Sequence, residues 1–233
     1  MKKLVLTIGC ALAVTGAAFA QGNVNWSAIS STSVTAQTNN TLYSPLFGGG
    51  TGPGSAIGGT LGAGNYYLEL LYTAYSGVQA VQPTTLSGLE AWSDAGASGQ
   101  STASAGKLAP LNGSSGFTVP WSPGTTDSIM LVIWSADLGT TWSGVQNILN
   151  NWSANMSNPL YANSFLGVST TGYITTFATT TTPGSQVFGA ATAQGVPIIS
   201  LGTQMYALPI PEPATMALAG LGGLALLLIR RRK

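Results

Sequence analysis

The stretch NYYLELLYTAY (Asn65–Tyr75) decides the fold class of this 233-residue chain. Its residues of even number would share one face of a β-strand, and its residues of odd number the other face. The even face holds Tyr66, Leu68, Leu70 and Tyr72. The odd face carries the only charge of the stretch, Glu69. We therefore expect a strand with one face in the core and a second face on which Glu69 turns toward water.

A second stretch, SIMLVIWS (Ser128–Ser135), is apolar without alternation and predicts a central strand that is buried on both faces. Six shorter runs are further strand candidates: Val24–Ile29, Gly116–Val119, Ser164–Ser169, Tyr173–Phe177, Pro197–Leu201 and Gln204–Leu208. Short runs separated by Gly, Pro and Asn are typical of all-β domains. The predicted fold is therefore mainly β, a β-sandwich or an irregular β-barrel-like domain.

One segment has a helical pattern instead. In TTWSGVQNILNNW (Thr140–Trp152) the apolar residues Trp142, Val145, Leu149 and Trp152 recur at helical spacing. We expect one short amphipathic helix at about 140–152, packed on the sheet through its tryptophans. The segment Gly48–Gly64 holds nine glycines in seventeen residues and predicts a loop.

The composition excludes several classes of function. Charged residues make up 6% of the chain, against roughly 25% in typical soluble proteins. Between residues 21 and 208 one cation, Lys107, faces five acids, which gives a net charge near −4. Such a body lacks the basic patch that nucleic acids require. The chain has no histidine, and its one cysteine is Cys10, so serine–histidine and cysteine–histidine catalysis and the usual zinc sites are excluded. We expect no catalytic residue, no metal and no cofactor.

The N-terminal segment has the three parts of a secretory signal peptide. Lys2 and Lys3 precede the apolar run Leu4–Ala13, and Ala18-Phe19-Ala20 forms a small-residue cleavage site. Cleavage is expected between Ala20 and Gln21, after export through a Sec-type machinery. The mature protein would then contain no cysteine and no disulfide, so packing alone must stabilise it.

The segment PIPEPATMALAGLGGLALLLIRRRK (Pro209–Lys233) has the pattern of a membrane-associated tail. Its uncharged stretch, Ala214–Ile229, would form a helix about 24 Å long, just short of the ~30 Å hydrocarbon core of a bilayer. The four cations that follow, Arg230, Arg231, Arg232 and Lys233, would stay on the cytoplasmic side. Two prolines, Pro211 and Pro213, would hold Glu212 extended at the outer membrane surface.

This tail resembles the PEP-CTERM sorting signal of Gram-negative bacteria. Pro211-Glu212-Pro213 matches its tripeptide, Ala214–Ile229 its apolar helix and Arg230–Lys233 its basic cluster. The resemblance implies processing by an exosortase, a membrane transpeptidase-like enzyme, and delivery to the cell surface, the medium or a biofilm matrix. The alternative is a permanent tail anchor whose prolines are incidental. The domain organisation is therefore a signal peptide (1–20), a β-rich extracellular domain (21–208) and a sorting signal (209–233).

For the extracellular domain we expect a non-enzymatic role in a matrix that contains exopolysaccharide. One alternative is a carbohydrate-binding module that uses exposed tryptophans, or, as a weaker variant, an ice-binding module that uses threonine-rich tracts. The remote alternative is a glycoside hydrolase, which needs two carboxylates about 5–9 Å apart in one cleft. The acids available are Glu69, Glu90, Asp94, Asp127 and Asp137.

Two pairs of these acids are close in sequence, and neither is expected to form a catalytic pair. Asp127 and Asp137 bracket the SIMLVIWS strand and would lie roughly 30 Å apart at ~3.3 Å per residue. Glu90 and Asp94 could share a helical face, but a solvated turn around Trp92 is expected instead. Glu69, with its apolar neighbours, is the acid of most interest.

Overall fold

The computed structural model describes residues 21–25, 33–36, 44–49, 55–56, 63–111, 116–178, 185–193, 195–197 and 201–210, with only the backbone at 33–36, 55–56 and 201–202. The predicted signal peptide, Trp26, and residues 211–233 with the expected hydrophobic helix lie outside the described residues. Most of the glycine-rich loop also lies outside them, apart from its two ends and the short strand β3 (Ser55–Ala56).

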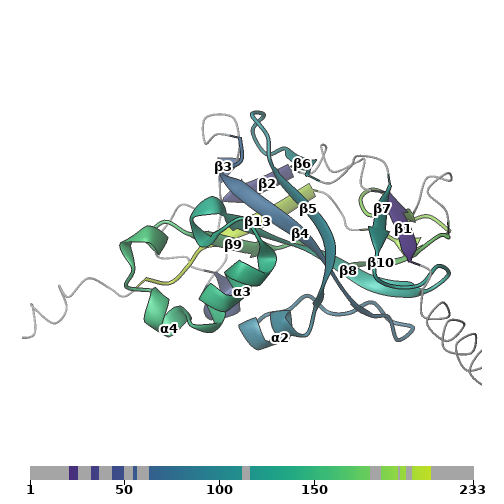
Figure 1. The fold of residues 1–233 in the computed structure, drawn as a ribbon, viewed down its shortest axis with the longest axis horizontal. Coiled ribbons are helices and arrows are strands. Elements are labelled where there is room, and N and C mark those ends of the chain that lie inside the picture. The colour runs from purple at the N-terminus through teal and green to yellow at the C-terminus, as the bar shows by residue number, and fades with distance from the viewer. Residues whose placement is uncertain are drawn as a thin grey trace, which may run out of the picture.

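The fold is mainly β, as predicted, and is built on one large twisted sheet (Figure 1). Its strand order is β3-β2-β13-β9-β8-β4-β5-β6, and β10 pairs with both β8 and β12. The strands are β2 (Ser33–Ala36), β4 (Tyr66–Ala74), β5 (Ser93–Ser101), β6 (Leu108–Pro110), β8 (Thr126–Ser135), β9 (Phe165–Val168), β10 (Gly172–Thr175), β12 (Gly195–Val196) and β13 (Leu201–Ala207).

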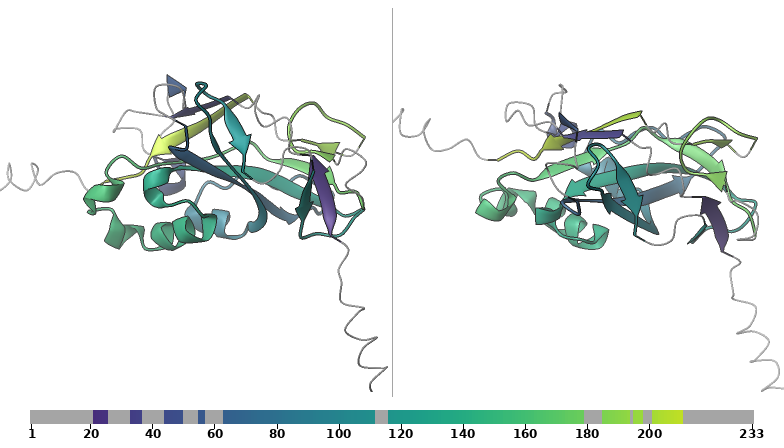
Figure 2. Two further views of the ribbon diagram at one scale, coloured as in Figure 1. Left: turned by 45° about the horizontal axis from the view of Figure 1, so that its top comes forward. Right: turned by 90° about the horizontal axis from the view of Figure 1, so that it is seen from above.

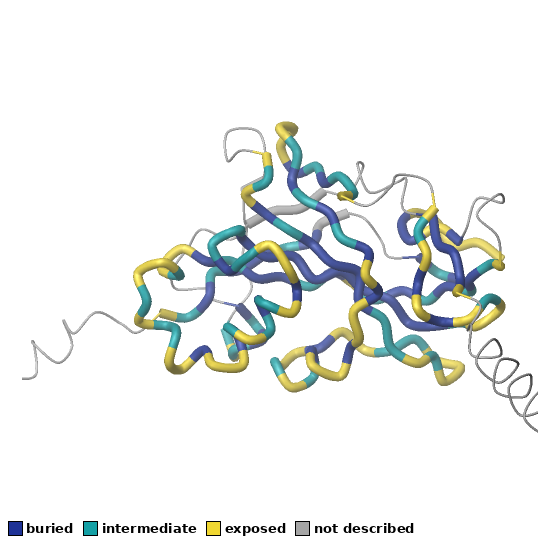
Figure 3. The backbone as a smooth tube through the Cα atoms, viewed as in Figure 1, coloured by how far each residue is buried: buried dark blue, intermediate teal, exposed yellow. Residues whose placement is uncertain are grey.

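The centre of the sheet is the antiparallel pair β4 and β8, which are the two strands that the sequence predicts most clearly. Tyr66 pairs with Ser135, and the register runs without a break to Ala74 opposite Asp127. β8 also pairs with β9 and β10 on its other side, so it is an interior strand. All its residues from Asp127 to Ser135 are buried, which confirms the prediction of a strand covered on both faces (Figure 3).

A second, three-stranded sheet covers one face of the large sheet at one end of the molecule (Figure 2). Its order is β11 (Ser185–Gln186), β1 (Gly22–Asn25) and β7 (Phe117–Val119). Val24 and Val119 of this sheet pack in one apolar cluster with Leu68 and Leu70 of β4 and Leu131 of β8. The even-numbered face of β4 therefore faces this core, as the alternation in the sequence predicts.

The opposite face of the large sheet is covered by helices. The predicted helix is confirmed as α3 (Trp142–Asn150), and a separate short helix, α4 (Trp152–Asn155), follows it. The side chains of Trp142, Val145, Leu149 and Trp152 are buried in the apolar cluster on this face. The rings of Trp142 and Trp134 of β8 lie 5.6 Å apart.

Short helices that the sequence pattern did not predict complete the helical side. They are α2 (Leu86–Glu90), η2 (Pro45–Phe47), η4 (Ala136–Leu138) and η5 (Pro159–Tyr161). Leu89 of α2, Leu46 of η2 and Leu138 of η4 are buried in the same cluster. Each of these helices is too short to show a helical repeat in the sequence, which is why pattern analysis misses them.

The nine-residue strand β5, SDAGASGQS, was also not predicted. It contains no large apolar residue, so its sequence looks like a loop. Its small residues are required by packing. Ala95 and Ala97 are buried beneath the three-stranded sheet, and a Cβ at Gly99 would lie 2.6 Å from the carbonyl oxygen of Ala109 on β6.

The other predicted strands are present with shifted ends. β1, β7, β9, β10 and β13 overlap five of the six shorter candidates, although residues 26–29 of the first candidate are not described. The sixth candidate, Pro197–Leu201, does not form a strand of its own. Pro197 follows β12, and Leu201 is the first residue of β13. Residues 198–200 between them are not described.

Candidate functional site

The last described residues, 208–210, come directly before the Pro-Glu-Pro motif, and hydrogen bonds hold them to the body. The Leu208 amide donates a hydrogen bond to the Ser164 carbonyl at 2.8 Å, and the Leu208 side chain is buried. The indole Nε1 of Trp152 donates to the Pro209 carbonyl at 2.9 Å. The Trp152 ring itself packs against Phe47 and Tyr161. The residues directly before the motif are therefore held in place beside α4.

Glu69 does not turn toward water as expected. Its side chain is only 6% exposed, and it lies on the helical face of β4, next to Leu71 and opposite Val132 of β8. Both of these neighbours belong to the apolar cluster beneath the helices. The expectation is wrong because helices cover this face of the sheet as well, so Glu69 and Leu71 are buried like Leu68 and Leu70 on the other face.

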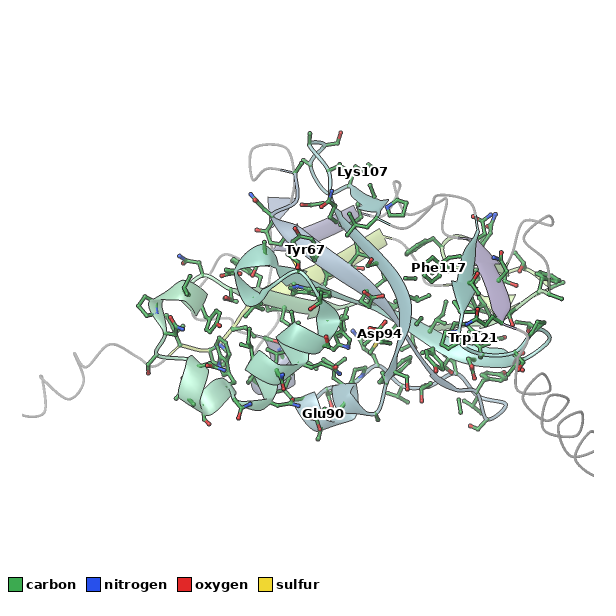
Figure 4. The ribbon with its side chains drawn as sticks, viewed as in Figure 1. Tyr67, Glu90, Asp94, Lys107, Phe117 and Trp121 are labelled. Carbon is green, nitrogen blue, oxygen red and sulfur yellow. The ribbon has the colours of Figure 1, made fainter. Side chains whose placement is uncertain are left out.

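Asp94 of β5 is the acid that the fold brings to Glu69. Ser98 pairs with Glu69 and Asp94 pairs with Leu71, so three residues of β5 face the single residue Leu70. The bulge contains Gly96, whose φ is +73°. The Asp94 carboxylate accepts a hydrogen bond from the Gly96 amide at 2.6 Å. The register therefore places Asp94 diagonally beside Glu69 on the same face of the sheet. Figure 4 labels Asp94 on β5.

The two carboxyl groups are joined by a side-chain hydrogen bond. Desolvation is the main cause that raises the pKa of Glu69 to about 9, and the charge of Asp94 and this hydrogen bond add to the effect. Glu69 is therefore protonated at neutral pH and donates to the exposed Asp94 carboxylate. The other Glu69 oxygen, Oε1, is buried without a hydrogen-bond partner.

The remaining acids lie apart from this pair. Glu90 ends α2, and both Glu90 and Asp94 are exposed where the chain turns into β5, as expected, although the Trp92 side chain between them is buried. Asp127 and Asp137 lie at the two ends of β8, as expected. Burial raises the pKa of Asp127. Asp137 accepts a hydrogen bond from the Ser164 hydroxyl at 2.6 Å.

The described tryptophans are core residues. The five in the described part of the chain are all buried: Trp92, Trp121, Trp134, Trp142 and Trp152. None of these five offers an exposed face on which a sugar ring could stack. These five positions therefore give no support to a carbohydrate-binding module that uses exposed tryptophans.

A cavity of about 410 Å³ lies at β9 and β13 of the large sheet, next to η2. It is lined by Ser44–Leu46, Gln82–Thr84, part of β9 with Thr170, and Thr203, Gln204 and Tyr206 of β13. None of these described lining residues is charged. The Tyr206 hydroxyl donates to Gln204 Oε1 at 2.7 Å, and Gln82 Nε2 donates to the Val168 carbonyl at 3.2 Å. The volume is in the range of small-molecule binding sites.

The wall of this cavity that contains residues 82–84 belongs to a long connection between β4 and α2. Gln79 Nε2 donates to both the carbonyl and the hydroxyl oxygen of Thr171, each at 2.6 Å. The Ala80 amide donates to the Ser128 hydroxyl at 3.1 Å. These bonds tie the connection to β8 and to the turn after β9, so the cavity has a fixed wall.

Two structural findings concern the described residues alone. In this part of the chain no helix combines the length and the apolar run needed to cross a bilayer. Within the same residues, no three His, Cys, Asp or Glu side chains gather closely enough to hold a metal ion.

The comparison with known families identifies the tail. Residues 209–233 match the family model of the PEP-CTERM protein-sorting motif. This match confirms the resemblance noted in the sequence and covers the Pro-Glu-Pro tripeptide, the apolar stretch and the basic cluster. The motif implies export, a cell-surface or extracellular destination, and processing by an exosortase. No curated protein and no solved structure gives a significant match to the chain.

Proposed function

We propose that this chain is a non-enzymatic protein of the cell surface or the biofilm matrix, delivered there by exosortase processing at Pro211-Glu212-Pro213. The observation that carries the proposal is the sorting motif at residues 209–233. After Sec-type export and removal of residues 1–20, the segment 214–229 would hold the protein in the inner membrane. Arg230–Lys233 would anchor it on the cytoplasmic side until processing releases the body.

A structural or adhesive role in an exopolysaccharide matrix suits the chemistry of the body. Its surface has few charges, since only six charged residues lie between positions 21 and 210. The proposal includes no catalytic role for Glu69 and Asp94, because Glu69 is buried beneath the helices, whereas a glycosidase pair must flank a substrate in an open cleft. No acid lines the 410 Å³ cavity.

The processing step is tested by mass spectrometry of the protein released by its native host. The mature protein should lack residues 214–233, and Glu212→Gln should accumulate in the membrane with the tail intact. Glu90→Gln is the matched control, because it makes the same change at an exposed position of the body. Released protein with an intact tail would overturn the proposal in favour of an anchor that is never removed.

The matrix role is tested separately, by fractionating the matrix of the host. The protein should co-purify with exopolysaccharide from wild-type cells and stay in the membrane fraction when Glu212 is replaced. Recovery of the processed protein entirely in the medium, free of polysaccharide, would contradict the matrix role without affecting the processing step.

A second candidate function, carbohydrate binding, is favoured by the cavity. Its polar groups are amides and hydroxyls, some of them held by hydrogen bonds, and Tyr206 with two prolines supplies apolar surface. Uncharged groups of this kind suit the hydroxyl groups of a neutral sugar better than an ionic ligand.

This second candidate is tested by titrating the protein with neutral disaccharides and with matrix polysaccharide, using calorimetry. Thr84→Trp, at an exposed residue of the cavity wall, should block the cavity and abolish binding. Thr118→Trp on β7, outside the cavity, is the control. Equal binding by both variants would remove the cavity from consideration.

A further inference from the structure

The distance between the folded body and the predicted membrane segment is very short. Ile210 is the last described residue, and the uncharged stretch begins at Ala214. Four Cα–Cα steps of an extended chain span at most about 14 Å. Whatever surface of the body lies around Ile210 must therefore stay within about 14 Å of the bilayer while the tail is uncut.

Contacts that hold the last described residues to the body determine which surface this is. Trp152 holds the Pro209 carbonyl, and Leu208 is buried and bonded to Ser164. The surface next to the membrane is therefore the end of the body formed by α4, η5 and residues 208–210, called here the α4 end. The three-stranded sheet lies at the other end of the molecule in every view of the ribbon (Figures 1 and 2).

The α4 end has the chemistry expected of a surface beside lipid headgroups. No charged residue occurs anywhere from Leu138 to Ile210, so the end carries no acid that an anionic membrane would repel. The acids that flank this stretch in the sequence are Asp137 and Glu212. Asp137 is partly covered and accepts a hydrogen bond from the Ser164 hydroxyl, and Glu212 belongs to the sorting motif, outside the described residues. Two large apolar side chains are exposed here, Leu160 at 69% and Ile210 at 40%. Tyr161 lies beside Leu160, and aromatic residues are favoured at this depth of a bilayer.

We infer that the α4 end rests on the outer surface of the lipid bilayer before processing, with Leu160 and Ile210 in contact with the headgroup region. This inference rests on the membrane step of the proposed function. It adds which surface of the body faces the lipid, and it implies that an enzyme cutting near Glu212 approaches beside α4 and η5.

The test uses the chain from Gln21 to Lys233, which is the form that the expected signal cleavage leaves, reconstituted in vesicles of phosphatidylethanolamine and phosphatidylglycerol without an exosortase. This form contains no cysteine, because Cys10 lies in the removed segment. An environment-sensitive fluorophore is then attached at Leu160→Cys or, as the matched control, at Thr118→Cys, an exposed position of β7 at the opposite end. A lipid with a spin-labelled headgroup serves as the quencher.

We expect quenching at position 160 to be several-fold stronger than at position 118. Equal quenching at both positions, in chains that resist carbonate extraction, would overturn the inference and leave the proposed function intact. Complete extraction of the chain by carbonate would overturn the membrane step and this inference together. Leu160→Ser should weaken the contact, read as a lower quenching of a label placed instead at Asn163→Cys, an exposed neighbour.

Discussion

Replacing Glu69 by glutamine should make the protein more stable at neutral pH. Glu69 is buried beside Asp94, and its pKa in the folded state is raised to about 9, from an ordinary value of 4.5. Between these two pH values the unfolded chain releases a proton that the folded protein keeps. Folding stability is therefore fully present below about pH 4.5 and falls as the pH rises toward 9. A glutamine side chain at this position has nearly the same shape as the protonated acid and cannot ionise.

The size of the effect follows from the pKa difference. Each pH unit between the two pKa values costs about 1.4 kcal/mol, so at pH 7 the burial of Glu69 costs on the order of 3 kcal/mol. Glu69→Gln should recover this amount at pH 7, and little or nothing at pH 4. The glutamine amide can still donate a hydrogen bond to Asp94, so the local packing is kept.

The assay is guanidinium unfolding at a series of pH values from 4 to 9, followed by the fluorescence of the buried tryptophans. The wild type should lose stability steadily over this range, whereas Glu69→Gln should lose much less. Glu90→Gln is the control, because it removes an exposed carboxylate and should keep the wild-type slope. Asp94→Asn should reduce the slope only in part, since it removes the neighbouring charge and leaves Glu69 buried. Parallel pH profiles for the wild type and Glu69→Gln would refute the reasoning.

Two further predictions concern the packing of the fold. Trp152→Phe keeps an aromatic ring but removes the donor to the Pro209 carbonyl, and should lower the free energy of unfolding by about 1 kcal/mol; an unchanged midpoint in guanidinium would contradict a structural role for this bond. Gly99→Ala should cost about 1–3 kcal/mol, because the new Cβ would lie 2.6 Å from the Ala109 carbonyl oxygen. Gly77→Ala is the comparison in the same thermal or chemical unfolding experiment. A Cβ at Gly77 has no atom within 4 Å, but φ there is +87°, so this variant measures backbone strain without a clash.

The strands and the helix that could be predicted are those whose signal is local. β4 alternates, β8 is continuously apolar, and α3 repeats its apolar residues at helical spacing, so each can be recognised without knowledge of its partners. β5 could not be recognised, because its alanines and glycines owe their identity to the neighbouring sheet and to β6 rather than to a period in the sequence.

The surroundings of Glu69 also could not be predicted fully from a local sequence pattern. Alternation correctly predicted which residues of β4 share a face. It could not predict that helices cover the second face, nor that a bulge at Gly96 brings Asp94 to Glu69. The two acids are 25 positions apart in the sequence and meet only through the pairing of β4 with β5.

By itself, the sequence determined the class of fold and the sorting signal at residues 209–233, because both are recorded in patterns of neighbouring residues. Only the tertiary structure decided that Glu69 is buried against Asp94, that uncharged residues from four segments line one cavity, and that Trp152 holds the chain just before Pro211. The physical reason is that burial, proton affinity and the position of residues 208–210 depend on which distant segments pack together. Strand register and core packing set these contacts, and a local pattern does not contain them.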